Sequence, residues 1–161
     1  MSNHEGHEGH EGHEEHEEHE EHEEHEGPRV GIRLNSPLNG REELVMSMTI
    51  GAAIAVHREL GPGFLESIYH KAMRVELESR NLAYESERAV RVKYRGVEIP
   101  GQRIDLVVER LVVVELEAVK RLDDIHRAQL ISYLKTTGLR AGLLINFRVA
   151  RLAHGLKRIV L

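Results

Sequence analysis

The spacing of apolar residues predicts two helices in the first half of the chain. From about Glu42 to Leu60, apolar side chains recur every three or four positions, which places them on one face of a helix. The run Gly61-Pro62-Gly63 is expected to end this helix. The same spacing returns from about Leu65 to Arg80 and predicts a second helix.

The period then changes from helical to strand-like. Apolar and basic residues alternate over 90–95, which is typical of a half-buried strand. Gly96 is expected to turn the chain into a second strand over 97–108, interrupted at Pro100-Gly101. The nearly continuous apolar run over 111–116 predicts a central strand that is buried on both faces.

The last third of the chain completes an α/β pattern. Asp123 or Asp124 is expected to cap a helix that ends at about Thr137. Strands are predicted over 141–146 and, at a sheet edge, over 156–161. The element order α-α-β-β-β-α-β-(β) predicts an α/β sandwich built on a mixed β-sheet.

The first 27 residues have a composition unlike that of the rest. His occupies every third position from His4 to His25, mostly separated by Glu and Gly, and no large apolar side chain follows Met1. Such a segment cannot build a core, so residues 1–27 are predicted to be disordered, 28–40 to be a linker, and 41–161 to form one domain. The imidazoles would bind Zn²⁺, Ni²⁺ or Cu²⁺ with little selectivity. The repeat therefore fits a metal-handling tail, a pH-sensitive acidic shield, or a slipped repeat or purification tag without a role.

Charge is divided unevenly along the chain. All 22 Lys and Arg follow residue 26, against 15 acidic residues there, which gives the body a formal charge of 22 − 15 = +7. This charge suits a polyanionic partner such as nucleic acid, or serves only solubility. There is no cysteine, no apolar run long enough to span a membrane and no apolar signal segment, so a cytoplasmic protein is expected.

Carboxylates interrupt two of the apolar strands. Asp105 lies between Ile104 and the apolar run 106–108, and Glu115 follows the apolar run 112–114. Glu117 shares a face with Glu115 because strand residues two apart point the same way. A hairpin between these strands would bring Asp105 close to Glu115, and Glu66 could join from the second helix. Such oxygen ligands suit Mg²⁺ or Mn²⁺. The alternative is that these are ordinary strand ends and a helix N-terminal acid.

The remaining polar residues carry weaker signals. A basic stripe of exposed side chains would face phosphates, or would simply be a solvated strand face, and it comprises Arg91, Lys93, Arg95 and Arg103. Four histidines are scattered through the body and are expected on the surface or in packing rather than in a site: His57, His70, His126 and His154.

Five sequence blocks resemble the GxxExxY proteins. The first block covers 56–69, in which the stretch from Gly63 to Tyr69 carries the signature that names this family, and the other four are 104–105, 114–116, 128–130 with 133–135, and 142–147. The family looks like a branch of the PD-(D/E)XK nuclease superfamily. The resemblance therefore implies a restriction-endonuclease-like sandwich and a Mg²⁺- or Mn²⁺-dependent nuclease that acts on DNA more readily than on RNA.

The same resemblance assigns roles to individual residues. Glu66 matches the acid of the first helix of the site, Asp105 the motif aspartate and Glu115 the acid of the E-x-K element. Together these three imply the metal ligands. Gln129 and Tyr133 match a Q-x-x-x-Y element that lies beside the site in related proteins.

Glu117 departs from the family pattern, which has lysine at this position. A glutamate cannot supply positive charge to a phosphate, and losing one such contact typically lowers a rate by about 10²–10³-fold. Lys120 or Lys135 would be a relocated lysine, or Glu117 would be a further metal ligand. The remaining alternative is a nuclease-like domain that binds nucleic acid or a partner without cutting.

Overall fold

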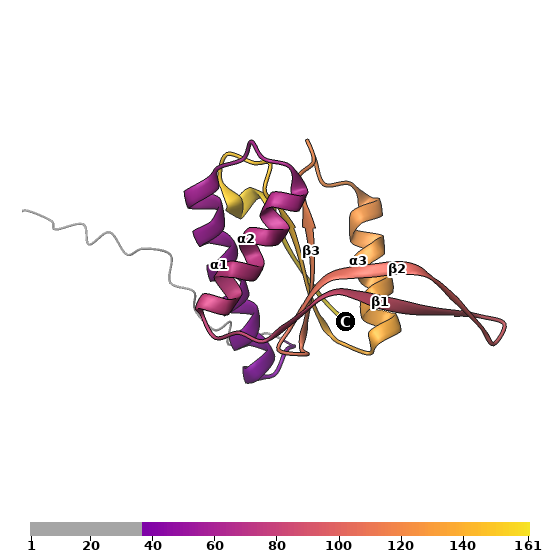
Figure 1. The fold of residues 1–161 in the computed structure, drawn as a ribbon. Helices are drawn as coiled ribbons and strands as arrows, with labels where there is room; N and C mark the ends of the chain where they lie inside the picture. The colour runs from indigo at the N-terminus through magenta and orange to yellow at the C-terminus, as the bar shows by residue number, and fades with distance from the viewer. Residues whose placement is uncertain (1–36) are drawn as a thin grey trace, which may run out of the picture.

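The computed structural model describes residues 37–161, in which a five-stranded sheet lies between helices (Figure 1). The predictions for the tail 1–27 and for most of the linker lie outside the described residues. The elements are α1 (Gly40–Leu60), α2 (Glu66–Ser79), β1 (Tyr84–Tyr94), β2 (Val97–Val108), β3 (Val112–Glu117), α3 (Asp124–Thr137), β4 (Ala141–Asn146), a 3₁₀ turn (Leu152–Gly155) and β5 (Leu156–Val160). The predicted order of helices and strands is confirmed.

The sheet is mixed, with the strands arranged in chain order from β1 to β5. Strands β1, β2 and β3 pair antiparallel, β3 and β4 pair parallel across the α3 connection, and β5 returns antiparallel to β4. Residues Val112–Leu116 of β3 are all buried, as expected for a central strand. The predicted mixed sheet with flanking helices, consistent with a restriction-endonuclease-like fold, is confirmed.

Two hydrophobic layers cover the two faces of the sheet. Helices α1 and α2 pack on one face, where Met46, Met73 and Leu116 are buried. Helix α3 covers the other face through Leu130 and Leu134. Figure 1 shows α1 and α2 on one side of β3 and α3 on the other. The central strands are therefore shielded from water on both faces.

Helix α1 begins two residues earlier than predicted. The Asn39 side chain accepts the backbone N–H of Glu42 at 2.9 Å, and the Glu42 carboxylate accepts the N–H of Asn39 at 2.9 Å. This reciprocal cap satisfies backbone groups that the first helical turn leaves unpaired. The sequence prediction placed Asn39 in a linker and therefore missed the cap.

The β1–β2 hairpin differs most from the prediction. Strand β1 begins at Tyr84 rather than at residue 90, because Tyr84 already pairs with Val108. Strand β2 runs on through the expected interruption at Pro100-Gly101, where only its pairing with β1 changes, by a register shift between Val90 and Val92. Gly101 adopts φ +127°, a conformation that side chains disfavour, and so accommodates the extra residue.

Candidate active site

The turn before α2 positions Glu66. The Tyr69 hydroxyl accepts the backbone N–H of Phe64 at 3.1 Å and donates to the carbonyl of Gly61. Its ring is buried and stacks on Phe147 with centroids 4.5 Å apart. The tyrosine thus fixes the connection between α1 and α2, and Glu66 becomes the first residue of α2. The spacing from Gly63 to Tyr69 thus lets the tyrosine hydroxyl reach back to the turn before α2.

Asp105 and Glu115 meet across the β2–β3 hairpin, as the sequence predicted. The Glu115 carboxylate accepts the backbone N–H of Asp105 at 3.1 Å, and Asp105 Oδ2 accepts the N–H of Leu116 at 2.8 Å. On the side of α2, His70 Nε2 lies 3.2 Å from the Asp105 carbonyl, to which it donates. These bonds hold both acids at fixed positions in the sheet.

Burial raises the pKa values of the acids on α2, β2 and β3, and the charge of Asp105 adds to the shifts of Glu66 and Glu115. Burial, helped by the charge of Asp105, raises the pKa of Glu115 to about 8. Burial also raises the pKa of Asp105, although the hydrogen bond from Leu116 opposes the shift. Partial burial and then the charge of Asp105 raise the pKa of Glu66. Burial is thus the main cause of all three shifts, and it favours the protonated form of each acid.

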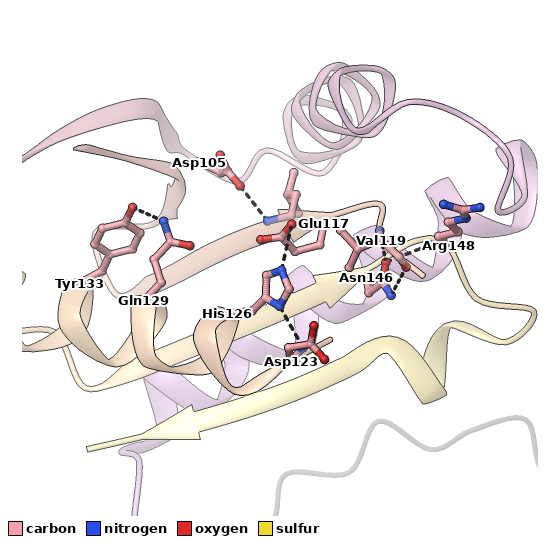
Figure 2. Close-up of polar contacts among 10 residues, drawn as sticks. Asp105, Glu117, Val119, Asp123, His126, Gln129, Tyr133, Asn146 and Arg148 are labelled. Carbon is pink, nitrogen blue, oxygen red and sulfur yellow. Dashed lines mark hydrogen bonds and ion pairs between the residues drawn. The ribbon is translucent and has the colours of Figure 1, made fainter. Parts of the chain in front are cut away.

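Glu117 faces a histidine that the sequence prediction assigned to the surface or to packing. His126 Nε2 lies 3.9 Å from Glu117 Oε2, and both side chains are less than one-fifth exposed (Figure 2). His126 Nδ1 accepts the N–H of Asp123 at 2.9 Å, so in the neutral ring the proton resides on Nε2. Burial and then the charge of Glu66 raise the pKa of Glu117.

The position of His126 has a signal in the sequence that the prediction did not use. His126, Gln129 and Tyr133 are spaced by three and four residues, which places them along one face of a helix. Figure 2 shows the three side chains on the same side of α3. The face that carries the Q-x-x-x-Y element therefore also carries this histidine.

Gln129 and Tyr133 are coupled beside the acids. Gln129 Nε2 donates to the Tyr133 hydroxyl at 2.8 Å (Figure 2). The Tyr133 side chain is buried, and burial followed by the charge of Glu115 raises its pKa. The phenol therefore keeps its proton, and with an amide N–H directed at its oxygen it can donate that proton elsewhere.

A sequence profile of the PD-(D/E)XK nuclease superfamily matches residues 43–159. The chain belongs to the PD-(D/E)XK nuclease superfamily. Comparison with curated proteins and with solved structures gives no match. Membership in this superfamily suggests a nuclease and implies nucleic-acid binding. None of the helices in the described part of the chain has the length and apolar character needed to traverse a bilayer.

Nucleases of the PD-(D/E)XK superfamily generally use divalent metals such as Mg²⁺. The donors here are carboxylate oxygens in a partly buried, negatively charged setting, which suits a hard cation. Within residues 37–161, however, no three His, Cys, Asp or Glu side chains are drawn together as a metal cage. Carboxylate oxygens fit the divalent metals that this superfamily uses, and the acidic side chains would have to move closer together to hold one.

The two lysines considered as replacements for the superfamily lysine are both exposed. Lys120 lies beyond β3 and lines a hollow of about 560 Å³ with Arg121 and His126. Lys135 lies on α3, two residues beyond Tyr133. No ion pair between described residues joins either lysine to a carboxylate. Lys120 borders the site through the hollow that it shares with His126.

Proposed function

We propose that this chain is a divalent-metal-dependent nuclease of the GxxExxY type that hydrolyses phosphodiester bonds in DNA. The observation that carries the proposal is the gathering of Glu66, Asp105 and Glu115: burial raises the pKa values of all three, and the charge of Asp105 raises those of Glu66 and Glu115 further. Acids whose pKa values are perturbed by burial together with a specific charge partner are candidates for functional sites. The superfamily profile supplies the reaction class.

Glu66, Asp105 and Glu115 would hold Mg²⁺ or Mn²⁺. Such an ion supplies Lewis acidity and a more acidic water at a phosphodiester. The backbone hydrogen bonds of Asp105 and Glu115 keep both acids in place before any ligand arrives. The three side chains would still have to converge around the ion.

The α3 face supplies hydrogen-bond donors. Tyr133, oriented by Gln129, would donate its phenolic proton to a non-bridging oxygen of the phosphate. His126 has its Nε2–H on the side of Glu117 and would contribute a second donor. Lys120, at the edge of the shared hollow, would add positive charge toward the nucleic-acid backbone.

Glu117 favours a second candidate function, a nuclease-like domain that binds nucleic acid or a partner without cutting it. Its carboxylate is partly buried, and its charge adds to the causes that raise the pKa of Glu115. At neutral pH an ionised Glu117 repels a phosphate where a lysine would attract it. Binding without hydrolysis is the expected behaviour if nothing else offsets this charge.

Cleavage by the full chain in Mg²⁺ or Mn²⁺ distinguishes these functions. The substrates are single- and double-stranded DNA, and the variants are Asp105→Ala and Glu117→Lys. Glu59→Ala serves as the control, because Glu59 is an exposed acid at the end of α1. Circular dichroism establishes that each variant folds.

Metal-dependent cutting that Asp105→Ala abolishes and Glu59→Ala preserves supports an active nuclease. Cutting that is absent in the native chain and present in Glu117→Lys supports the binding function. If neither the native chain nor Glu117→Lys cuts although both are folded, the proposed phosphodiester hydrolysis is wrong.

A further inference from the structure

The β1–β2 hairpin extends well beyond the layers that bury the rest of the sheet. Every residue from Arg91 to Arg103 is exposed, whereas Ile104 and Val90, where the ribbon joins the body, are buried. In Figure 1 the ribbon passes α3 and continues outward to an isolated turn. A two-stranded ribbon gains little stability in water on its own. The folding of the core therefore does not account for this projecting ribbon, residues 91–103.

One face of the projecting ribbon is apolar. Val92 pairs with Ile99, and Tyr94 pairs with Val97. Cross-strand partners and residues two apart along a strand share a face, so these four side chains point the same way. They are between 36% and 64% exposed. Scattered surface apolar residues are ordinary, but four gathered on one face of a protruding element indicate a contact surface.

The rest of the projecting ribbon is basic. Its charged residues are Arg91, Lys93, Arg95, Arg103 and Glu98, which give 4 − 1 = +3. The contact between Arg91 and Glu98 is long, at 4.0 Å, and both side chains are more than half exposed. An exposed pair of this kind contributes little, so the basic side chains remain available to a polyanion.

The projecting ribbon is joined directly to the candidate active site. Arg103, at its base, lies two residues before Asp105 in the same strand. From Val97 to Asp105, β2 spans about 26 Å at the usual rise of a strand. That length corresponds to roughly eight base pairs of duplex. A duplex whose phosphate lies at Asp105 would therefore reach the tip of the ribbon.

We propose that the projecting ribbon enters a groove of double-stranded DNA and holds the duplex beside the site. The proposal rests on the proposed function and adds the substrate class to it. The major groove admits a two-stranded β-ribbon. The apolar face would contact base edges, and the long basic side chains, which start from the opposite face by strand alternation, would extend to the phosphates that border the groove. A second copy of this chain is a poorer occupant, because two ribbons of charge +3 repel each other. Single-stranded DNA is also poorer, because Tyr94 is the only aromatic residue on the ribbon.

Fluorescence anisotropy with the full chain in EDTA tests binding without cleavage. The probes are a labelled duplex of about two helical turns and the corresponding single strand. The variants are Lys93→Glu and Tyr94→Ala. Arg110→Glu is the matched control, because Arg110 is an exposed cation in the β2–β3 turn, at the other end of β2 from the ribbon. Both ribbon variants are expected to weaken duplex binding about tenfold, with Arg110→Glu close to the native chain.

Three outcomes would overturn the proposal. The first is an equal loss of duplex affinity in Lys93→Glu and Arg110→Glu. The second is a native chain that binds duplex no more tightly than single strand. The third is a native chain that is a dimer by light scattering and that Tyr94→Ala converts to a monomer. The last outcome would make the projecting ribbon a self-association surface.

Failure of the proposed nuclease function looks different. Ribbon-dependent duplex binding without metal-dependent cleavage would leave the projecting ribbon as a DNA-binding element and remove the catalytic proposal. Metal-dependent cleavage by the native chain, together with native duplex binding by both ribbon variants, would keep the catalytic proposal and remove the DNA-binding role of the projecting ribbon.

Discussion

Asp105 and Glu115 hold each other across the β2–β3 hairpin, with the Glu115 carboxylate accepting the backbone N–H of Asp105 at 3.1 Å. The Asp105 carboxylate in turn accepts the N–H of the residue after Glu115, at 2.8 Å. Two acids of the site therefore serve as hydrogen-bond acceptors within the sheet. Changes in their protonation act on the stability of the fold as well as on ligand binding.

The stability of the metal-free protein is expected to fall as pH rises from about 4.5 to about 8. Burial raises the pKa of Glu115 from 4.5 to about 8, so across this window the folded state holds a proton that the unfolded state releases. Unfolding is then favoured by rising pH. Urea denaturation at pH 5.5 and pH 8, followed by circular dichroism in EDTA, measures the difference. Glu115→Gln should reduce the dependence of the free energy of unfolding on pH. If the dependence is the same in that variant, other titratable groups cause it and the prediction is wrong.

Tyr69→Phe is expected to destabilise the protein by about 1–3 kcal/mol, because it leaves two backbone groups without their partner. The lost contacts are with the N–H of Phe64 and the carbonyl of Gly61. The ring and its stacking on Phe147 remain, so the loss reports the hydroxyl alone. Urea denaturation gives the value. Tyr94→Phe removes an exposed hydroxyl on the projecting ribbon and should change stability little.

Asn146→Ala is expected to loosen the segment that follows β3. The Asn146 side chain is 1% exposed, accepts the N–H of Val119 at 3.1 Å and donates to its carbonyl at 2.9 Å (Figure 2). Asn146→Ala leaves the N–H and the carbonyl of Val119 without this partner and should lower the free energy of unfolding by about 1–3 kcal/mol. Hydrogen exchange should rise around Val119 and Lys120. Gln102→Ala, which removes an exposed amide, is the control, and equal exchange in the two variants would contradict the role given to Asn146.

Glu117→Lys is expected to lower the pKa of Glu115. The charge of Glu117 is one of the causes that raise this pKa, and a lysine replaces it with an attractive charge. Carbon-13 NMR of the glutamate carboxyl groups in the metal-free protein follows the titration. Glu59→Lys makes the same charge change on α1 and should leave the midpoint in place. If the titration midpoint of Glu115 does not move in Glu117→Lys, the charge of Glu117 does not affect the pKa of Glu115, and the prediction is wrong.

The sequence predicted the element order because apolar periodicity records which faces are buried. It located α3 and β4 closely, since Gly138 and the polar residues around these elements limit them sharply. It missed the start of β1 because the residues over 84–89 are mostly polar, and only pairing with β2 makes them a strand. Local composition does not contain that long-range pairing.

The candidate site was predictable to a similar extent. A short hairpin brings Asp105 to Glu115, so their proximity follows from strand alternation and one turn. The contact between Glu117 and His126 joins β3 to α3, and its geometry depends on how the helix packs on the sheet. Spacing along α3 indicates that His126 shares a helix face with Gln129 and Tyr133, but it does not indicate that this face contacts Glu117.

Strand β1 is the first strand of the sheet and pairs only with β2 within the described residues. An edge of eleven residues is a template on which other chains can add strands and aggregate. Arg88, Arg91 and Lys93 place positive charge along it, which is a common defence against such growth. Stripping the charges from β1 would therefore cost solubility at high protein concentration, whatever its effect on DNA. Charge reversal keeps the edge charged, which is why Lys93→Glu is a cleaner probe of binding than an apolar replacement.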